Sequence, residues 1–258
     1  MKKNSVTFID LFAGVGGMRI AFESAGGKCV FSSEWDPAAQ KTYEANFGEK
    51  PFGDITKINA NEIPNFDILL AGFPCQPFSS IGKRAGFLHE TQGTLFYDVL
   101  RIIEEKKPKS FLLENVQGLV THDSGRTFEV ILKSLDKAGY TVHHSILDAS
   151  DYGVPQFRKR IYIVGFSKKE SKKKLEFEWP SKLKEKTGVG QFIEVDVEGY
   201  SISEHLQKSY IYKVDDGRPQ VVSKTFDQPV KTLVASYHKI QRLSGTFVKD
   251  GPTGLRLL

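Results

Sequence analysis

Over the first 167 residues of this chain, short apolar runs alternate with amphipathic helical patterns. Few folds are compatible with this regular alternation of strands and helices. The predicted strands lie near residues 5–11, 28–34, 67–72, 109–115, 141–148 and 161–166, and the predicted helices near 17–26, 37–47, 94–106 and 126–138. Alternation at this spacing favours a doubly wound α/β sheet. After residue 167 the pattern changes to short, polar, strand-like pieces with frequent glycines, so we expect a larger domain over 1–167 and a smaller, less regular one over 168–258.

Composition sets the broad class of the protein. A chain of 258 residues with 40% hydrophobic content has enough apolar material for a packed core. No apolar run approaches the roughly 20 residues that span a bilayer, and Met1–Ser5 has no signal-like apolar segment, so we expect a cytoplasmic protein without membrane contact. The net charge is a modest +5, and the lysine-rich run at 168–174 is typical of a solvated segment.

The two cysteines have different settings. Cys29 lies in an apolar, strand-like stretch and is expected to belong to the core. Cys75 lies in the segment GFPCQPFS at 72–79, where two prolines bracket it directly after the apolar run 67–71. This arrangement predicts no disulfide and, without cysteine–histidine spacing, no metal site. A thiol on a strand-end loop is instead positioned to act as a nucleophile.

Polar residues also end two later strands. Glu114 and Asn115 appear only at the carboxyl end of the apolar run 111–116, and open parallel sheets bind ligands at that edge. In the segment QFRKRIYIVG at 156–165, Arg158 and Arg160 occupy alternate positions and would share one face of an extended strand. That face suits an anionic ligand.

A glycine-rich segment near the start is a candidate nucleotide loop. FAGVGG at 12–17 follows a predicted strand and precedes a predicted helix, but alone it fits a nicotinamide-binding loop or a tight turn equally well. Glu34 and Trp35 end the next strand, where a carboxylate can accept hydrogen bonds from ribose hydroxyls and an indole can stack on adenine. Asp54 could accept from the adenine amino group, so these residues indicate a nucleoside ligand.

Taken in this order, the segments at 10–17, 72–79, 111–116 and 156–165 resemble the DNA cytosine-5 methyltransferase family of bacterial restriction-modification systems. The resemblance covers residues 5–167. It implies a Rossmann-like fold that binds S-adenosyl-L-methionine, a partial target-recognition domain, and methyl transfer to carbon 5 of cytosine in a specific duplex DNA sequence. By this resemblance the cofactor pocket would be lined by Phe12, Gly14, Glu34, Trp35, Asp54, Ile55 and Leu95.

The resemblance also implies a covalent mechanism. Carbon 5 of cytosine becomes nucleophilic only after a thiolate adds at carbon 6, which is the role expected of Cys75 on a base flipped out of the duplex. Glu114 is expected to donate a proton near ring nitrogen 3, a role that requires burial to keep its carboxyl protonated. Arg158 and Arg160 would stabilise charge on the target nucleotide. Asn115 is expected to fix backbone, and Gln156 to bond the loop or the site's edge.

Two regions are expected to contact DNA. The long loop after Cys75 would close over the flipped base through Ser79, Lys83 and Arg84. KTLVA at 231–235 resembles a Thr-Leu element of the family's target-recognition region, which points to Thr232 and Leu233. Further candidate groups for phosphates or base edges are Lys224, Lys231, His238, Lys239, Gln241 and Arg242.

The chain departs from the family pattern after Leu258, where the family continues into a further packing segment and an Asn-containing cofactor motif. We therefore expect a truncation, a decayed gene, or one subunit of a split enzyme whose second subunit supplies the remainder, and little activity from the chain alone. Two alternatives stay open: a tRNA cytosine-5 methyltransferase, and a non-enzymatic remnant that binds cofactor or DNA. A nicotinamide dehydrogenase would leave Cys75 and Glu114 without roles.

Overall fold

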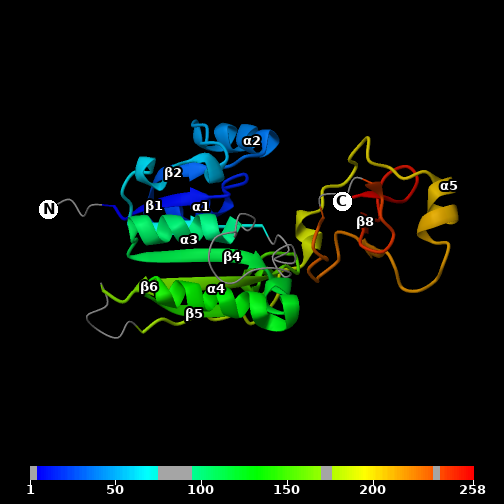
Figure 1. The fold of residues 1–258 in the computed structure, drawn as a ribbon. Coiled ribbons are helices and arrows are strands. Elements are labelled where there is room, and N and C mark those ends of the chain that lie inside the picture. Colours follow the sequence, from blue (N-terminus) through cyan, green and yellow to red (C-terminus); the bar gives the residue numbers. More distant parts are fainter. Residues whose placement is uncertain (1–4, 75–94, 170–175, 235–238) are drawn as a thin grey trace, which may run out of the picture. The chain divides into compact units, whose positions relative to one another are not determined.

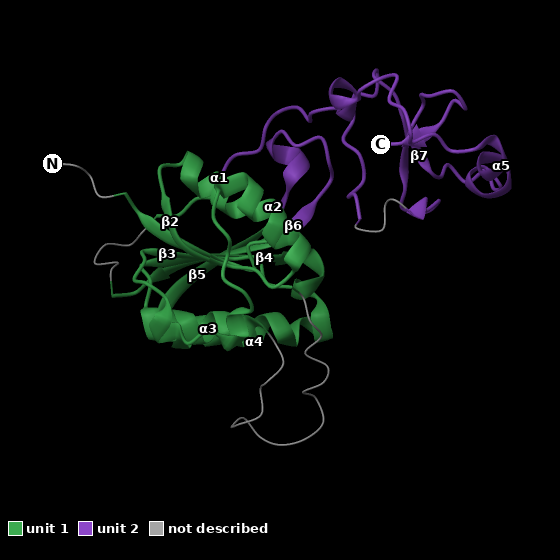
Figure 2. Ribbon diagram, turned by 90° about the horizontal axis from the view of Figure 1, so that it is seen from above, with its two compact units in different colours: residues 1–146, 160–179 green, residues 147–159, 180–258 purple. Residues whose placement is uncertain are grey.

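The structure is a computed structural model that describes residues 5–74, 95–169, 176–234 and 239–258. The chain divides into two compact units (Figure 2). Unit 1 comprises Met1–Ile146 and Arg160–Trp179, and unit 2 comprises Leu147–Lys159 and Pro180–Leu258. Among the described residues, no helix combines the length and the apolar character needed to cross a bilayer.

Unit 1 is built on a six-stranded sheet with the strand order β2-β1-β3-β4-β6-β5 (Figure 1). The strands are β1 Thr7–Leu11, β2 Lys28–Ser33, β3 Ile68–Ala71, β4 Ser110–Val116, β5 Tyr140–Asp148 and β6 Lys159–Ser167. β2, β1, β3 and β4 are parallel to one another, and β6 runs antiparallel to β4. This parallel-rich sheet confirms the predicted α/β class.

Helices cover both faces of the sheet, as a doubly wound fold requires. They are α1 Gly17–Ser24, α2 Pro37–Phe47, α3 Leu95–Lys106 and α4 Arg126–Lys137. Figure 2 shows α3 and α4 together on one face and α1 and α2 on the other. Phe96, Val99 and Ile103 lie at helical spacing on α3 and are fully or almost fully buried in the main core. The strand and helix bounds agree with the predicted ones to within a few residues.

The start of α2 shows how the local sequence positions the site. Asp36 is its N-cap and accepts a hydrogen bond from the Ala39 N–H at 2.7 Å, while Pro37 occupies the first helical turn. Gly48 ends the helix in the left-handed conformation, with φ 71°. These signals fix α2 directly after Glu34, the predicted ribose-binding acid.

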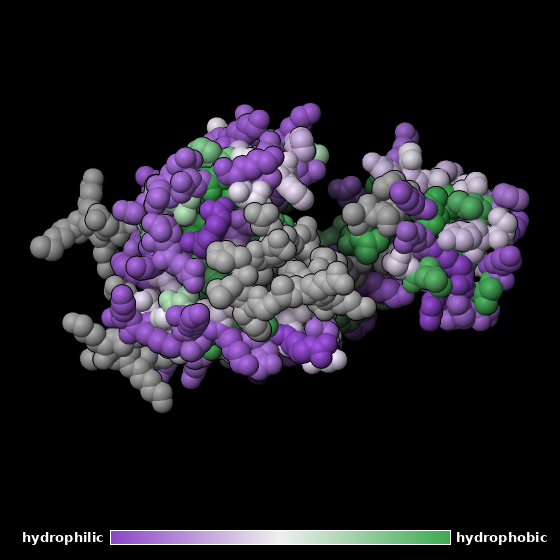
Figure 3. Space-filling model, in the orientation of Figure 1, coloured by the Kyte–Doolittle hydropathy of each residue, from purple (hydrophilic) through white to green (hydrophobic). Residues whose placement is uncertain are grey.

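Unit 2 has shorter elements and two small apolar clusters. Its three-stranded sheet has the order β7-β8-β9, formed by Gln220–Val222, Thr246–Val248 and Arg256–Leu257, and its α-helix α5 is Glu204–Leu206. The clusters are centred on Val222 and Phe247. Apolar side chains such as Leu183 and Leu243 remain exposed, and green atoms interrupt the polar surface of this unit in Figure 3. A small unit of this kind has a thin core.

The contact-based division differs from the domain boundary expected at residue 167. Residues 147–159 belong with unit 2 because the backbone pairs there: Phe157 N–H donates to the Val230 carbonyl at 2.8 Å, and Val230 N–H to the Pro155 carbonyl at 3.0 Å. Residues up to Trp179 belong with unit 1 because Phe177 packs on Phe166 of β6, with ring centroids 5.6 Å apart. The boundary thus depends on long-range pairing that composition does not reveal.

Candidate active site and ligand pocket

The carboxyl ends of the parallel strands meet at one edge of the sheet of unit 1, and predicted site residues follow those ends. β1 leads into the loop 12–16, β2 into Glu34, and β3 into Gly72. The Ala13 N–H donates to the Ser33 carbonyl at 2.9 Å and joins the first two of these segments. The topology therefore gathers segments that lie far apart in the sequence at the edge where such sheets bind ligands.

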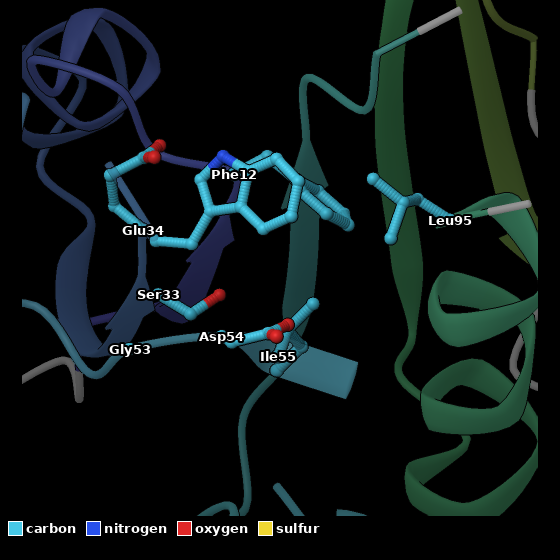
Figure 4. Close-up of a pocket in the computed structure, with 8 residues that line it drawn as sticks. Phe12, Ser33, Glu34, Gly53, Asp54, Ile55 and Leu95 are labelled. Carbon is cyan, nitrogen blue, oxygen red and sulfur yellow. The ribbon is translucent and has the colours of Figure 1, made fainter. Parts of the chain in front are cut away.

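A hollow opens at this edge. Its lining comes from four segments: Phe12, Ser33, Glu34, Trp35, Gly53, Asp54, Ile55 and Leu95 (Figure 4). Six of the seven residues expected around the cofactor are in this set. The Trp35 side chain is largely exposed, at 60%, while Ile55 is buried. Apolar walls and two carboxylates together suit a ligand with an aromatic body and polar edges.

The seventh residue, Gly14, holds the carboxylate of Glu34 in place at the hollow. Its N–H donates to Glu34 Oε2 at 2.8 Å, and the Asp36 N–H donates to Glu34 Oε1 at 2.8 Å. Gly14 has φ 56°, a left-handed conformation that glycine adopts without strain. Each Glu34 oxygen keeps further acceptor capacity, so both can still receive a ligand hydroxyl.

Asp54 is held as a carboxylate at another wall of the hollow. Its Oδ1 accepts from the Thr56 hydroxyl at 2.8 Å and from the Thr56 N–H at 3.0 Å, which caps the 3₁₀ turn Ile55–Lys57. These bonds, the hydroxyl's first, hold the pKa of Asp54 below its ordinary value. An ionised carboxylate is a hydrogen-bond acceptor only, so Asp54 can recognise a donor such as an amino group.

Two lining residues, Ser33 and Gly53, were missed by the sequence reasoning. Both had a signal: Ser33 is a polar residue ending an apolar strand, the pattern that identified Glu114, and Gly53 directly precedes Asp54. The backbone places them side by side, because Phe52 pairs with Ser33 as an isolated parallel bridge beyond the end of β2. Both residues could therefore have been predicted as lining residues from the sequence.

Glu114 and Arg160 form an ion pair at the ends of β4 and β6. Val116 lies opposite Arg160 in the antiparallel register, so Arg160 and Glu114, two residues away, share a face. Arg160 Nε lies 2.9 Å from Glu114 Oε1, and the two side chains are 17% and 21% exposed. A guanidinium therefore faces the carboxyl that is predicted to act as the general acid.

Asn115 anchors the backbone that leads to Cys75. It is buried, its Nδ2 donates to the Phe73 carbonyl at 2.8 Å, and its Oδ1 accepts from the Val116 N–H at 2.8 Å. This is the backbone role expected of it. Cys75 itself lies outside the described residues, as do Ser79, Lys83 and Arg84.

Arg158 occupies a different setting from Arg160. It precedes β6, belongs to unit 2 and is exposed, and its N–H donates to Asp148 Oδ1 at 3.0 Å. Asp148 also accepts from the Ser150 N–H, and these hydrogen bonds hold its pKa below the ordinary value against the opposing effect of burial. Gln156 pairs with Val230 as a backbone bridge. The side chain that the structure places against Glu114 is that of Arg160.

The predicted Thr-Leu element lies in unit 2. Thr232 Oγ1 donates to the Phe157 carbonyl at 2.5 Å, so its hydroxyl holds the segment onto the loop that precedes Arg158. Leu233 follows with 37% of its side chain exposed. Thr232 thus fixes backbone, while Leu233 presents apolar surface.

Arg242, a candidate DNA contact from the sequence, is buried and structural, and that expectation was wrong. Its guanidinium donates to both oxygens of Asp216, at 2.5 and 3.0 Å, and to the carbonyls of Ile211 and Val214. A guanidinium with these partners closes the loop 211–216 and is not presented to solvent. Of the other candidates, Lys224, Lys231 and Lys239 are exposed, Gln241 accepts from the Ser244 hydroxyl, and His238 lies outside the described residues.

Comparison with known proteins gives one family. The family described as C-5 cytosine-specific DNA methylase matches residues 6–254. The type II methyltransferase M.MspI of a Moraxella species is 59% identical over 251 residues, covering 97% of this chain and 59% of that protein. M.BsuFI of Bacillus subtilis is 58% identical over 253 residues, covering 98% of this chain and 61% of the relative. The chain thus spans about three fifths of the length of these relatives.

Solved structures support the fold. A mutant DNMT2 of Spodoptera frugiperda matches with a TM-score of 0.76 at 21% identity, over 98% of this chain and 86% of that one. The methyltransferase EhMeth of Entamoeba histolytica also matches with a TM-score of 0.76 at 21% identity, over 99% and 83% of the two chains. At this identity the likeness concerns the fold alone.

Proposed function

Because the chain belongs to the C-5 cytosine-specific DNA methylase family, we propose that it takes part in methyl transfer from S-adenosyl-L-methionine to carbon 5 of cytosine in duplex DNA. The observation that carries this proposal is one sheet edge with two features: a hollow suited to a nucleoside, and the Glu114–Arg160 pair beside the strand that leads to Cys75. The names of its two relatives place the proposed activity in a restriction-modification system.

The residues of the hollow fit the cofactor. Phe12, Ile55 and Leu95 offer apolar surface, Glu34 keeps acceptor capacity for ribose hydroxyls, and Asp54 is an acceptor for the adenine amino group. The indole of Trp35 would stack on the purine. When bound, the cofactor supplies an electrophilic methyl group.

The chain's own residues would prepare the cytosine. We propose that the Cys75 thiolate forms a bond to carbon 6 while Glu114 delivers a proton at ring nitrogen 3, so that the ring's electrons become available at carbon 5. After methylation, water or hydroxide takes the carbon 5 proton and the bond between carbon 6 and sulfur breaks to release the thiolate. Ring nitrogen 3 then returns its proton to the Glu114 carboxylate, which restores the neutral aromatic ring. Arg160 would orient the Glu114 carboxyl, and Arg158 would contact the backbone of the extruded nucleotide.

Unit 2 would hold the duplex. Leu233 and the exposed lysines 224, 231 and 239 are proposed as its contacts, and Ser79, Lys83 and Arg84 as contacts of the loop after Cys75. Action on duplex DNA, the substrate proposed from the family, supports the further proposal that the protein works in the cytoplasm.

A mechanism-based trap tests the proposal. The purified chain is incubated with S-adenosyl-L-methionine and duplex DNA in which 5-fluorocytosine replaces cytosine, because fluorine blocks the final elimination. A denaturing gel should show a covalent protein–DNA complex that Cys75→Ser abolishes. Cys29→Ser is the matched control and should still trap, since Cys29 lies half-buried in β2.

The same gel assay distinguishes the proposed function from its alternatives. Competition by unlabelled tRNA that exceeds competition by duplex DNA would contradict the DNA substrate and favour an RNA methyltransferase. A folded chain that binds the cofactor but traps nothing would contradict turnover by this chain alone, and restoration of trapping by a second purified subunit would identify a split enzyme.

A further inference from the structure

Ser33 carries an unpaired hydroxyl on the wall of the hollow. It is the last residue of β2, it is 1% exposed, and within the described part of the chain its Oγ has no hydrogen-bond partner. A buried hydroxyl without a partner costs free energy, so its persistence requires an explanation. Figure 4 shows this hydroxyl pointing toward the side of the hollow where Asp54 and Ile55 lie.

The preceding serine shows that the chain can satisfy such a group. Ser32 is 5% exposed and projects from the opposite face of β2, because side chains alternate along a strand. Its hydroxyl is hydrogen-bonded to Tyr43 of α2. The two adjacent serines are therefore equally buried, yet only the one that faces the hollow lacks a partner among the described residues.

Gly53 borders the same hollow without a structural need for glycine. Its φ lies outside the left-handed region, and a β-carbon added there would meet no atom within 4 Å. A larger residue would thus be tolerated by the fold at this position of the lining.

We propose that Ser33 and Gly53 form a subsite for the purine edge of the ligand, an inference that rests on the proposed function. Ser33 Oγ donates a hydrogen bond to a purine ring nitrogen, and Gly53 leaves room for that edge of the ring. The subsite then pairs a donor, Ser33, with an acceptor, Asp54. Adenine offers the matching acceptor and donor, whereas hypoxanthine has a carbonyl in place of the amino group and would face the Asp54 carboxylate.

Calorimetric titration with S-adenosylhomocysteine and thermal unfolding of the ligand-free protein test this subsite. Ser33→Ala should weaken binding about fivefold, the usual effect of one lost hydrogen bond. The ligand-free Tm should stay the same or rise, because the unpaired hydroxyl is removed. Ser32→Ala is the matched control: it loses its bond to Tyr43, so Tm should fall while the Kd stays constant. Unchanged binding by Ser33→Ala would overturn the hydrogen bond.

Gly53→Ala tests the second half of the subsite. Its ligand-free Tm should match the wild type within about 2 °C, while its Kd for S-adenosylhomocysteine should rise at least about tenfold through overpacking against the ligand. An unchanged Kd would overturn the assignment of Gly53.

Ligand analogues identify the atom that Ser33 meets. Among the 1-, 3- and 7-deaza analogues of S-adenosylhomocysteine, one should bind the wild type about fivefold more weakly than the parent ligand and show no further loss in Ser33→Ala. Further loss in Ser33→Ala with all three analogues would overturn the proposal. Failure of the wild type to bind S-adenosylhomocysteine is a different result, because it would contradict the proposed function itself.

Discussion

At the scale of single residues, the Glu114–Arg160 pair gives the candidate active site a fixed geometry. Arg160 Nε contacts Oε1 of the carboxyl, and Oε2 is directed toward Gly72, where an added β-carbon would lie 3.7 Å from it. Gly72 belongs to the segment that leads to Cys75. The guanidinium thus orients Glu114 toward the strand-end loop, and we propose Arg160 as a positioning residue for the proposed acid.

Replacement of Arg160 tests that role. Arg160→Gln should lower kcat for DNA methylation by about 10²-fold, because a general acid contributes about that much when it is correctly placed. Arg160→Lys should recover little, since an ammonium lacks the planar fork. Lys159→Gln removes the adjacent charge and is the control, expected to retain most of the activity. Wild-type kcat in Arg160→Gln, measured by single-turnover methylation, would contradict the role.

Asp10, in the middle of the sheet, is a second residue of interest because its pKa is shifted by its surroundings. It lies on β1, is 1% exposed, and its Oδ2 has no hydrogen-bond partner among the described residues. Burial raises the pKa of its carboxyl to about 7, against weaker opposing effects of Arg19. Between pH 4 and 7 the folded protein therefore keeps a proton that the unfolded chain has lost, and stability falls as the pH rises through that window.

Asp10→Asn removes this titration and isolates its effect. The free energy of unfolding of the variant relative to wild type should increase by about 2 to 3 kcal/mol from pH 5 to pH 8, because the ionised Asp10 is penalised only at the higher pH. Urea unfolding at four pH values measures the difference. A constant offset across this range would show that Asp10 does not titrate there, whatever the sign of the offset.

At the scale of elements, the turn between β1 and α1 depends on its packing against α2. Gly16 has φ 91°, and a β-carbon there would lie 2.1 Å from Cε2 of Phe47. The Asn46 amide donates to the Val15 carbonyl at 3.0 Å and binds the same turn to α2. The turn that holds Gly14 against Glu34 is therefore fixed from both sides.

Neighbouring glycines give a controlled test of this packing. Gly16→Ala should lower the free energy of unfolding by about 2 to 4 kcal/mol, through the clash with Phe47 and the left-handed φ. Gly17→Ala meets no atom within 4 Å and begins α1, so it should be neutral or slightly stabilising. Equal stabilities of the two variants in urea unfolding would contradict the packing argument.

The elements of unit 1 were predictable because each signal is local. Asp36, Pro37 and Gly48 mark the ends of α2 in the sequence itself, and the runs that form the strands are contiguous. The prediction that Arg242 contacts DNA failed because its partner Asp216 lies 26 residues away in the sequence. The burial of Arg242 therefore leaves no local sequence pattern. The sequence-based boundary put residues 147–159 in the larger domain, whereas they group with unit 2 through backbone hydrogen bonds with Val230, which is far away in the sequence.

At the scale of the whole molecule, the chain joins two units with different kinds of core. Among the described residues, unit 1 has one large apolar cluster. Unit 2 has two small clusters, and buried arginines contribute to its stability as well. Arg242 closes the loop 211–216, and Arg256 donates to Asp250 at 3.0 Å. These two arginines serve the structure of unit 2, so a positive residue there is not by itself a sign of DNA contact.

The salt dependence of DNA binding distinguishes a structural arginine from a proposed DNA contact. Lys239 is exposed, and if it contacts a phosphate, Lys239→Gln should reduce the slope of log K against log salt by about 0.9 without changing Tm. Arg242→Gln should lower Tm, because it leaves Asp216 and two backbone carbonyls without their guanidinium, and should keep the slope. Fluorescence anisotropy with a duplex of about 20 base pairs, at temperatures where both variants are folded, measures the slopes. A reduced slope with an unchanged Tm in Arg242→Gln would show that this arginine binds DNA after all, and an unchanged slope in Lys239→Gln would remove Lys239 from the interface.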